Sequence, residues 1–175
     1  MKPTGVILPL GLLLGCATPG WAYVAGKDGP VLRMTVNFFE AEKFADVGDR
    51  SIPSSADRET ILAALKEYLI QQACRVIPAT HKLIVTVTDL DQAGGFEPWN
   101  GPGFDDIRIV KDIYPPRLQL VFRLIDAEGN IVREGRRELR DTAFLMKMTV
   151  NQHDRLRHEK ALIENWLRAE FGRAK

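Results

Sequence analysis

The sequence predicts a single α+β domain, in which two helices pack on one face of a mixed or antiparallel sheet of about four strands. Three observations support this fold class. Several segments alternate apolar and polar residues with a period of two, which is typical of half-buried strands. Two other segments repeat apolar residues at helical spacing. The order is strand, helix, strand, possible short strand, hairpin and helix, so the helices are expected to cover one face of the sheet. We expect the domain to span residues 31–172, after a flexible lead-in at 23–30.

The first strand and the first helix follow from the pattern of residues 32–75. Leu32, Met34, Val36 and Phe38 alternate with polar side chains, which predicts a strand. Ser54 to Asp57 then has the chemistry of a helix cap. Apolar residues at helical spacing follow the cap: Ile61, Leu62, Leu65, Tyr68, Leu69 and Ala73. The helix is expected to end near Arg75, because Pro78 stops it.

The second half of the chain predicts the remaining strands and a closing helix. A strand is expected at 83–88, a short strand at 107–110, and the clearest strand at 118–124. A turn at 126–130 makes a hairpin with a return strand at 131–139. The final helix is expected from about Asp154, with most of its apolar residues on one face: Leu156, Ile163, Trp166, Leu167 and Phe171.

Residues 1–22 have the organisation of a secretory signal peptide. A basic residue, Lys2, precedes an apolar run at 6–14 and then small residues. The run is shorter than the roughly 20 residues that cross a bilayer. Two processing routes fit: cleavage after Ala22, which gives a free periplasmic protein, or lipidation of Cys16, which gives a membrane-tethered lipoprotein. We therefore expect an exported protein that is periplasmic or associated with the cell envelope, and that meets a membrane only through a lipid anchor at Cys16.

Charge is divided unevenly along the chain. Residues 23–106 carry 8 basic and 13 acidic residues, whereas residues 107–175 carry 15 basic and 10 acidic residues. The two halves neutralise each other, so the composition argues against a nucleic-acid partner. A basic face on the C-terminal half remains open as a surface for an anionic envelope component.

Residues 89–106 are expected to form a long loop, rich in Gly, Pro and Asp. Loops of this length inside compact domains are often functional. Phe96, Trp99 and Phe104 are candidate contacts for an envelope protein, because exposed aromatic side chains anchor interfaces. The alternative is that these rings fold back as a lid over the sheet.

Two carboxylates, Asp89 and Asp91, stand two residues apart where the loop begins. Carboxylate oxygens suit calcium or magnesium, which makes the pair a candidate metal site. The spacing lacks the third polar ligand of a calcium-binding loop, so turn capping is the competing interpretation. We predict no cofactor.

A basic cluster lies on the expected return strand. Arg133 and Arg137 share one face of that strand and are candidate contacts for an anionic partner. The competing interpretation is a solvated strand edge that charge protects from aggregation.

Several motifs together resemble the bacterial family known as domain of unknown function 3016. The most specific are Asp-x-Asp-x-Ala-Gly at 89–94 and Arg-x-Val-Lys-Asp-Ile at 108–113, and the likeness extends from about Leu32 to Phe171. The resemblance implies an exported protein with one domain, and it supplies no catalytic residues.

The sequence therefore favours a non-enzymatic binding or structural module that uses its 89–106 loop, although enzymatic activity stays open. One alternative is a periplasmic hydrolase that uses the carboxylates or a metal, since paired carboxylates can do acid/base work. The other is a carrier of a small ligand or lipid, because periodicity does not distinguish a filled core from a cavity.

Overall fold

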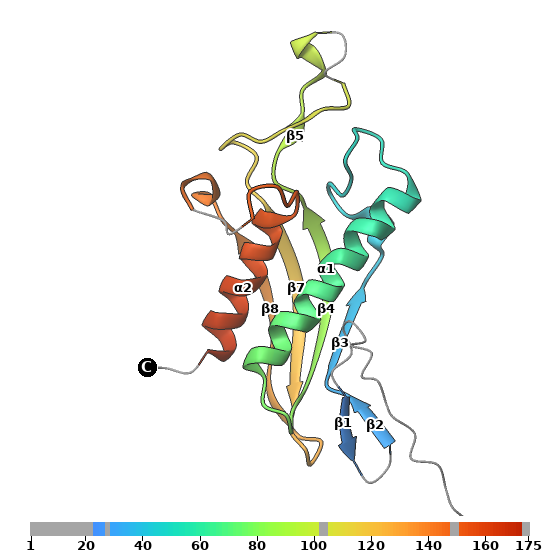
Figure 1. Ribbon diagram of the computed structural model, residues 1–175, viewed down its shortest axis with the longest axis vertical. Coiled ribbons are helices and arrows are strands. Elements are labelled where there is room, and N and C mark those ends of the chain that lie inside the picture. Colours follow the sequence, from blue (N-terminus) through green and yellow to red (C-terminus); the bar gives the residue numbers. More distant parts are fainter. Residues whose placement is uncertain (1–22, 27–28, 102–104, 148–150, 173–175) are drawn as a thin grey trace, which may run out of the picture.

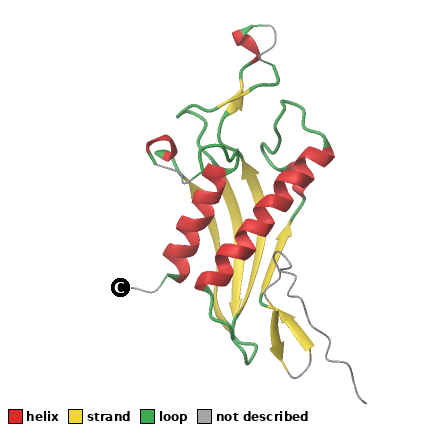
Figure 2. Ribbon diagram, viewed as in Figure 1, coloured by secondary structure: helices red, strands yellow, loops and turns green. Residues whose placement is uncertain are grey.

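A mixed four-stranded sheet with two helices on one face forms the body of the protein (Figures 1 and 2). The strand order is β3 (Met34–Phe38), β4 (Lys82–Asp91), β7 (Arg117–Ile125) and β8 (Ile131–Arg140). The covering helices are α1 (Ser55–Val76) and α2 (Arg157–Phe171). The computed structural model describes residues 23–26, 29–101, 105–147 and 151–172. It confirms the predicted α+β class.

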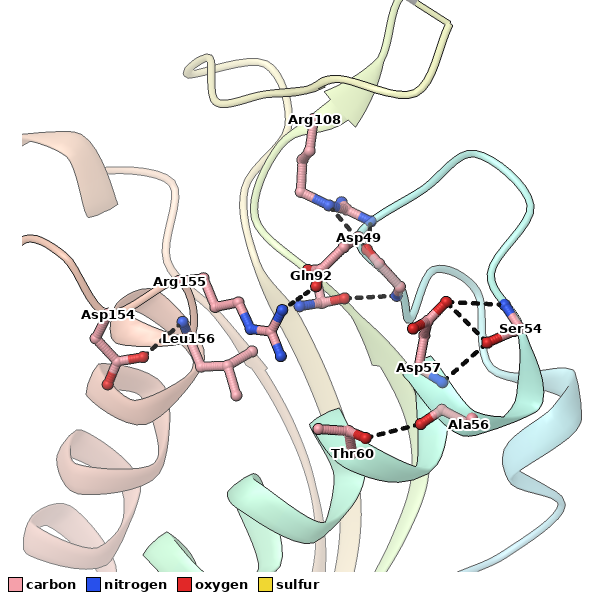
Figure 3. A network of polar contacts seen from close by, with 11 residues as sticks. Asp49, Ser54, Ala56, Asp57, Thr60, Gln92, Arg108, Asp154, Arg155 and Leu156 are labelled. Atoms are coloured by element: carbon pink, nitrogen blue, oxygen red, sulfur yellow. Dashed lines mark hydrogen bonds and ion pairs between the residues drawn. The ribbon is translucent and has the colours of Figure 1, made fainter.

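Helix α1 makes the crossover that lets β3 and β4 run parallel. Its N-terminus carries a capping box, in which Ser54 Oγ accepts from the Asp57 amide and the Asp57 carboxylate accepts from the Ser54 amide (Figure 3). The helix buries one side against the sheet: Ile61, Leu62, Leu65, Leu69, Ile70 and Ala73. The predicted cap and apolar face are both confirmed.

The core lies between the helices and the sheet. Strand β7 points every second side chain into it: Leu118, Leu120, Phe122 and Leu124. Phe122 makes edge-to-face contacts with Trp166 and Phe171, which lie on and at the end of α2. A void beside Leu65 and Ile163, between the helices and the sheet, measures about 10 Å³, which leaves room for about one water molecule. A wider pocket of about 560 Å³ opens where the helices end, beside Ile77, Leu124 and Phe171.

Strand β4 is longer than its sequence pattern predicts. It continues to Asp91, so residues 89–91 belong to the sheet and not to the predicted loop. The pairing with β7 is irregular between Val87 and Asp89, after which Asp91 lies opposite Arg117. The ion pair between Asp91 and Arg117 explains the extension, because it matches charges across the two strands.

Outside the main sheet, β1 (Tyr23–Gly26) and β2 (Gly29–Leu32) form an antiparallel two-stranded sheet. The predicted lead-in at 23–30 falls within this hairpin, and its flexibility stays a prediction. Within the described residues, no helix is long and apolar enough to span a membrane. The predicted signal peptide, with Cys16 and Ala22, lies outside them.

Candidate functional site

Between β4 and β7 the chain leaves the sheet and forms a projection that we call the arm, of which the structure describes residues 92–101 and 105–116. It contains β5 (Gly95–Phe96), the short 3-10 helix η2 (Pro98–Asn100) and β6 (Arg108–Ile109), and β5 pairs antiparallel with β6. Figure 1 shows the arm extending beyond the end of the sheet at which both helices begin. The predicted loop is therefore partly ordered by its own hydrogen bonds.

One arginine holds the base of the arm to the body. The guanidinium of Arg108 donates to both carboxylate oxygens of Asp46, at 2.7 and 2.9 Å. It also donates to the carbonyls of Gly48 and Gly94, at 2.7 and 3.1 Å. Only 14% of the Arg108 side chain is exposed, and its cation lies 4.6 Å from the centre of the Phe96 ring. Phe96, a predicted partner contact, is thus partly covered by Arg108.

A buried carboxylate ties the two sides of the arm together. Glu97 is 3% exposed, and its oxygens accept hydrogen bonds from Lys111 Nζ at 2.6 and 2.8 Å. Tyr114 Oη donates to the same carboxylate at 3.2 Å, and its pKa is raised by burial and by Glu97. Glu97 therefore contacts two residues that follow it by 14 and 17 positions in the sequence.

The start of the arm is also fastened to α2 and to the loop between β3 and α1. The Gln92 side-chain oxygen accepts from the Gly48 amide at 2.7 Å (Figure 3). The Glu159 carboxylate accepts from the Ala93 amide at 2.7 Å, and its second oxygen is buried with no hydrogen bond from any described residue. Burial raises the pKa of Glu159, because the charged form is desolvated.

A polar cleft of about 470 Å³ opens beneath the arm. It is lined in part by Asp46, Asp91, Arg117, Glu138 and Arg140. Arg117 pairs with Asp89 at 3.1 Å and with Asp91 at 3.7 Å. The pKa of Asp91 is raised, first by burial and then by the nearby carboxylates Asp46 and Asp89. Both acidic and basic groups therefore line the cleft.

The two predicted metal ligands come together in the structure, but around a cation of the protein itself. Asp89 and Asp91 both pair with Arg117, so the guanidinium takes the place that a metal ion would have beside these two carboxylates. Across the part of the chain that the structure describes, no three His, Cys, Asp or Glu side chains form a group suited to a metal.

The arm exposes several apolar side chains. Trp99 is 71% exposed and Ile113 is 65% exposed. Ile107 and Val110 add two further exposed apolar residues on the same arm. Of the predicted aromatic contacts, Trp99 is thus accessible, whereas Phe104 lies outside the described residues. A base held by hydrogen bonds, together with exposed apolar side chains, is expected of a docking element.

The two predicted arginine contacts lie elsewhere, on β8. Arg137 makes two hydrogen bonds to the Glu170 carboxylate, at 2.9 and 3.0 Å, and its cation lies 5.2 Å from the Phe122 ring centre. Arg133 also pairs with Glu170, at 3.6 Å. Both side chains therefore hold β8 to the end of α2, and the structure does not bring them together with the arm.

Sequence reasoning missed the residues that fasten the arm: Arg108, Glu97, Lys111 and Glu159. Arg108 carried one signal, because it is a single cation inside a short apolar stretch, between Ile107 and Ile109. Its partner Asp46 lies 62 residues away, and nothing local in the sequence relates the two.

Comparison with known proteins gives a family and a distant structural likeness. The family described as "Protein of unknown function (DUF3016)" matches residues 33–169. No curated protein shows a significant match. A solved dodecamer of a PelC variant from Paraburkholderia phytofirmans is 12% identical, with a TM-score of 0.39. That match covers 90% of this chain and 95% of the other, and it carries no argument about function.

Proposed function

The chain belongs to the DUF3016 family, and we propose that this member is a non-catalytic binding module of the cell envelope. The arm, residues 92–116, is its docking element, and a protein is its partner. The observation that carries the proposal is the exposure of Trp99 and Ile113 on an arm whose base is fastened by Arg108.

The energetics of binding support this assignment of the arm. A segment whose backbone is already ordered loses less conformational freedom when a partner covers it. The Arg108 and Glu97 contacts fix the backbone on both sides of the outer segment. Trp is also among the residues that most often dominate the binding energy of interfaces. An exposed Trp99 on this base therefore fits a protein-binding surface.

Neither alternative gains an observation of comparable weight. The carboxylates proposed for acid/base or metal chemistry, Asp89 and Asp91, are both paired with Arg117. In the middle of the helix–sheet layer, where a carrier would hold an apolar ligand, the void beside Leu65 measures about 10 Å³. The wider pocket of about 560 Å³ lies at the ends of the helices and is lined partly by the charged side chains Arg75, Arg133 and Glu170. Export to the envelope rests on the sequence of residues 1–22 and is part of the proposal.

The test compares two variants for retention of a partner. Trp99→Ser combined with Ile113→Ser removes the two most exposed apolar side chains of the arm and leaves the Arg108 and Glu97 contacts in place. An affinity-tagged native protein is isolated from the envelope fraction after mild crosslinking, and the proteins retained with it are identified by mass spectrometry. We expect a specific protein that the double variant loses.

The matched control is Ile52→Ser, which removes another exposed apolar side chain from the loop that precedes α1. The control should retain the partner as the native protein does. Equal retention by the native protein, the double variant and the control, with all three folded, would contradict a role for the arm.

A further inference from the structure

Strand β8 presents an open edge whose charges follow a regular pattern. It pairs with β7 on one side, and among the described residues no strand pairs with its other side. On the face away from the helices, the side chains alternate in sign: Glu134, Arg136, Glu138 and Arg140. Charged side chains of either sign are enough to keep an edge strand from pairing with other strands, so that role does not explain why the sign of the charge alternates.

We propose that β8 pairs with β8 of a second copy of this chain, antiparallel and around a two-fold axis at Arg137. In that register Glu134 lies opposite Arg140 of the partner subunit, and Arg136 lies opposite Glu138 of the partner subunit. The symmetry repeats both pairs, so four opposite-charge pairs line one face of the joined strands. Directly opposed side chains of opposite charge stabilise antiparallel pairing, whereas like charges oppose it. The alternation thus makes the edge complementary to itself.

The face toward the helices is compatible with the same register. Arg137 would meet Arg137 of the partner subunit, but each makes two hydrogen bonds to its own Glu170, a carboxylate that it shares with Arg133. Arg133 would lie opposite Asp141 of the partner subunit. Arg137 also donates to the Arg136 carbonyl at 2.9 Å, and an amide of the second strand would replace that contact.

The helix layer leaves room for the second copy. Helix α2 contacts both β7 and β8, so it packs on both strands of the pair. Strands are about 4.8 Å apart and packed helices about 8–10 Å apart, so two helices over four strands match in width. The pairing would give an eight-stranded sheet covered by four helices on one face, in which α2 lies beside α2 of the partner subunit.

The first test measures mass in solution by sedimentation velocity on the purified protein. We expect a dimer that dissociates more readily as salt is raised, because the four pairs are close to solvent. Arg136→Glu places like charges opposite each other twice, and it should weaken dimerisation at least about tenfold. Arg136→Glu combined with Glu138→Arg restores opposite charges and should restore the dimer.

The control is Glu67→Arg, a charge reversal on the exposed side of α1. Circular dichroism and thermal melting establish that every variant is folded. A native protein that stays monomeric overturns the proposal. So does a dimer that is unaffected by Arg136→Glu, or one that the double exchange does not restore.

A second test fixes the register. In a Cys74→Ser background, Arg137→Cys places one thiol opposite its copy, at a distance that a disulfide spans. Arg133→Cys loses a contact with the same Glu170, but its thiol would lie about eight residues along the strand from its copy, on the order of 26 Å. We expect a covalent dimer from Arg137→Cys and none from Arg133→Cys. The reverse result, or equal yields, would overturn this register.

Discussion

The Arg108 contact gives the strongest prediction about stability. Arg108→Met keeps an apolar side chain over Phe96 but leaves the Asp46 carboxylate and two carbonyls without their donor. Removing one partner of a buried ion pair typically costs 3–5 kcal/mol. The Asp46 side chain is 28% exposed and water can reach it, so we expect the lower end, about 3 kcal/mol. For a domain of this size, that loss corresponds to a fall in Tm of about 6–12 °C.

The assay is thermal and urea unfolding followed by circular dichroism, with Arg123→Met as the matched control. Arg123 also pairs with a carboxylate, that of Glu134, but both side chains are more than half exposed. Exposed pairs contribute at most about 1 kcal/mol, so the control should lose about a third as much stability or less. Equal losses in the two variants, or a fall in Tm below about 2 °C for Arg108→Met, would refute the reasoning.

Three further predictions concern single side chains. Folding raises the pKa of Glu159 above its usual value of 4.5, so the charged carboxylate destabilises the native state as pH rises above that value. Glu159→Gln should therefore gain stability relative to the native protein over this range of pH. Equal pH slopes of the unfolding free energy in urea would contradict this. Trp99→Ser should change the unfolding free energy by less than about 0.5 kcal/mol, because its ring is mostly exposed; a larger loss would show that the ring is packed. Phe122→Ala should cost about 3–5 kcal/mol through the core cavity, and a loss below about 1 kcal/mol would contradict its central position.

Most of the body of the fold could be predicted, because its signals are local. The capping box at Ser54 and the period of two through Leu118 and Leu124 each lie within one element. The end of β4 was not predicted, because polar Asp89 and Asp91 interrupt the apolar pattern there. Their pairing with Arg117, on another strand, is what keeps them in the sheet.

The candidate site was harder to predict, because its contacts join distant segments. The composition of the arm identified Trp99 as a candidate surface residue, and the structure places it in an exposed position. The roles of Arg133 and Arg137 depend on Glu170, which arrives from α2 only after folding. The link between Arg108 and Asp46 joins residues on opposite sides of α1 in the sequence, and no spacing rule relates them.

Photocrosslinking in living cells tests the proposed role of the arm most directly. A photoreactive amino acid replaces Trp99, and the same residue replaces Glu67 on α1 as the control. We expect a discrete crosslinked protein from position 99 and none from position 67. A folded protein that gives no adduct at position 99, or the same adducts at both positions, would contradict the proposal that the arm docks a partner.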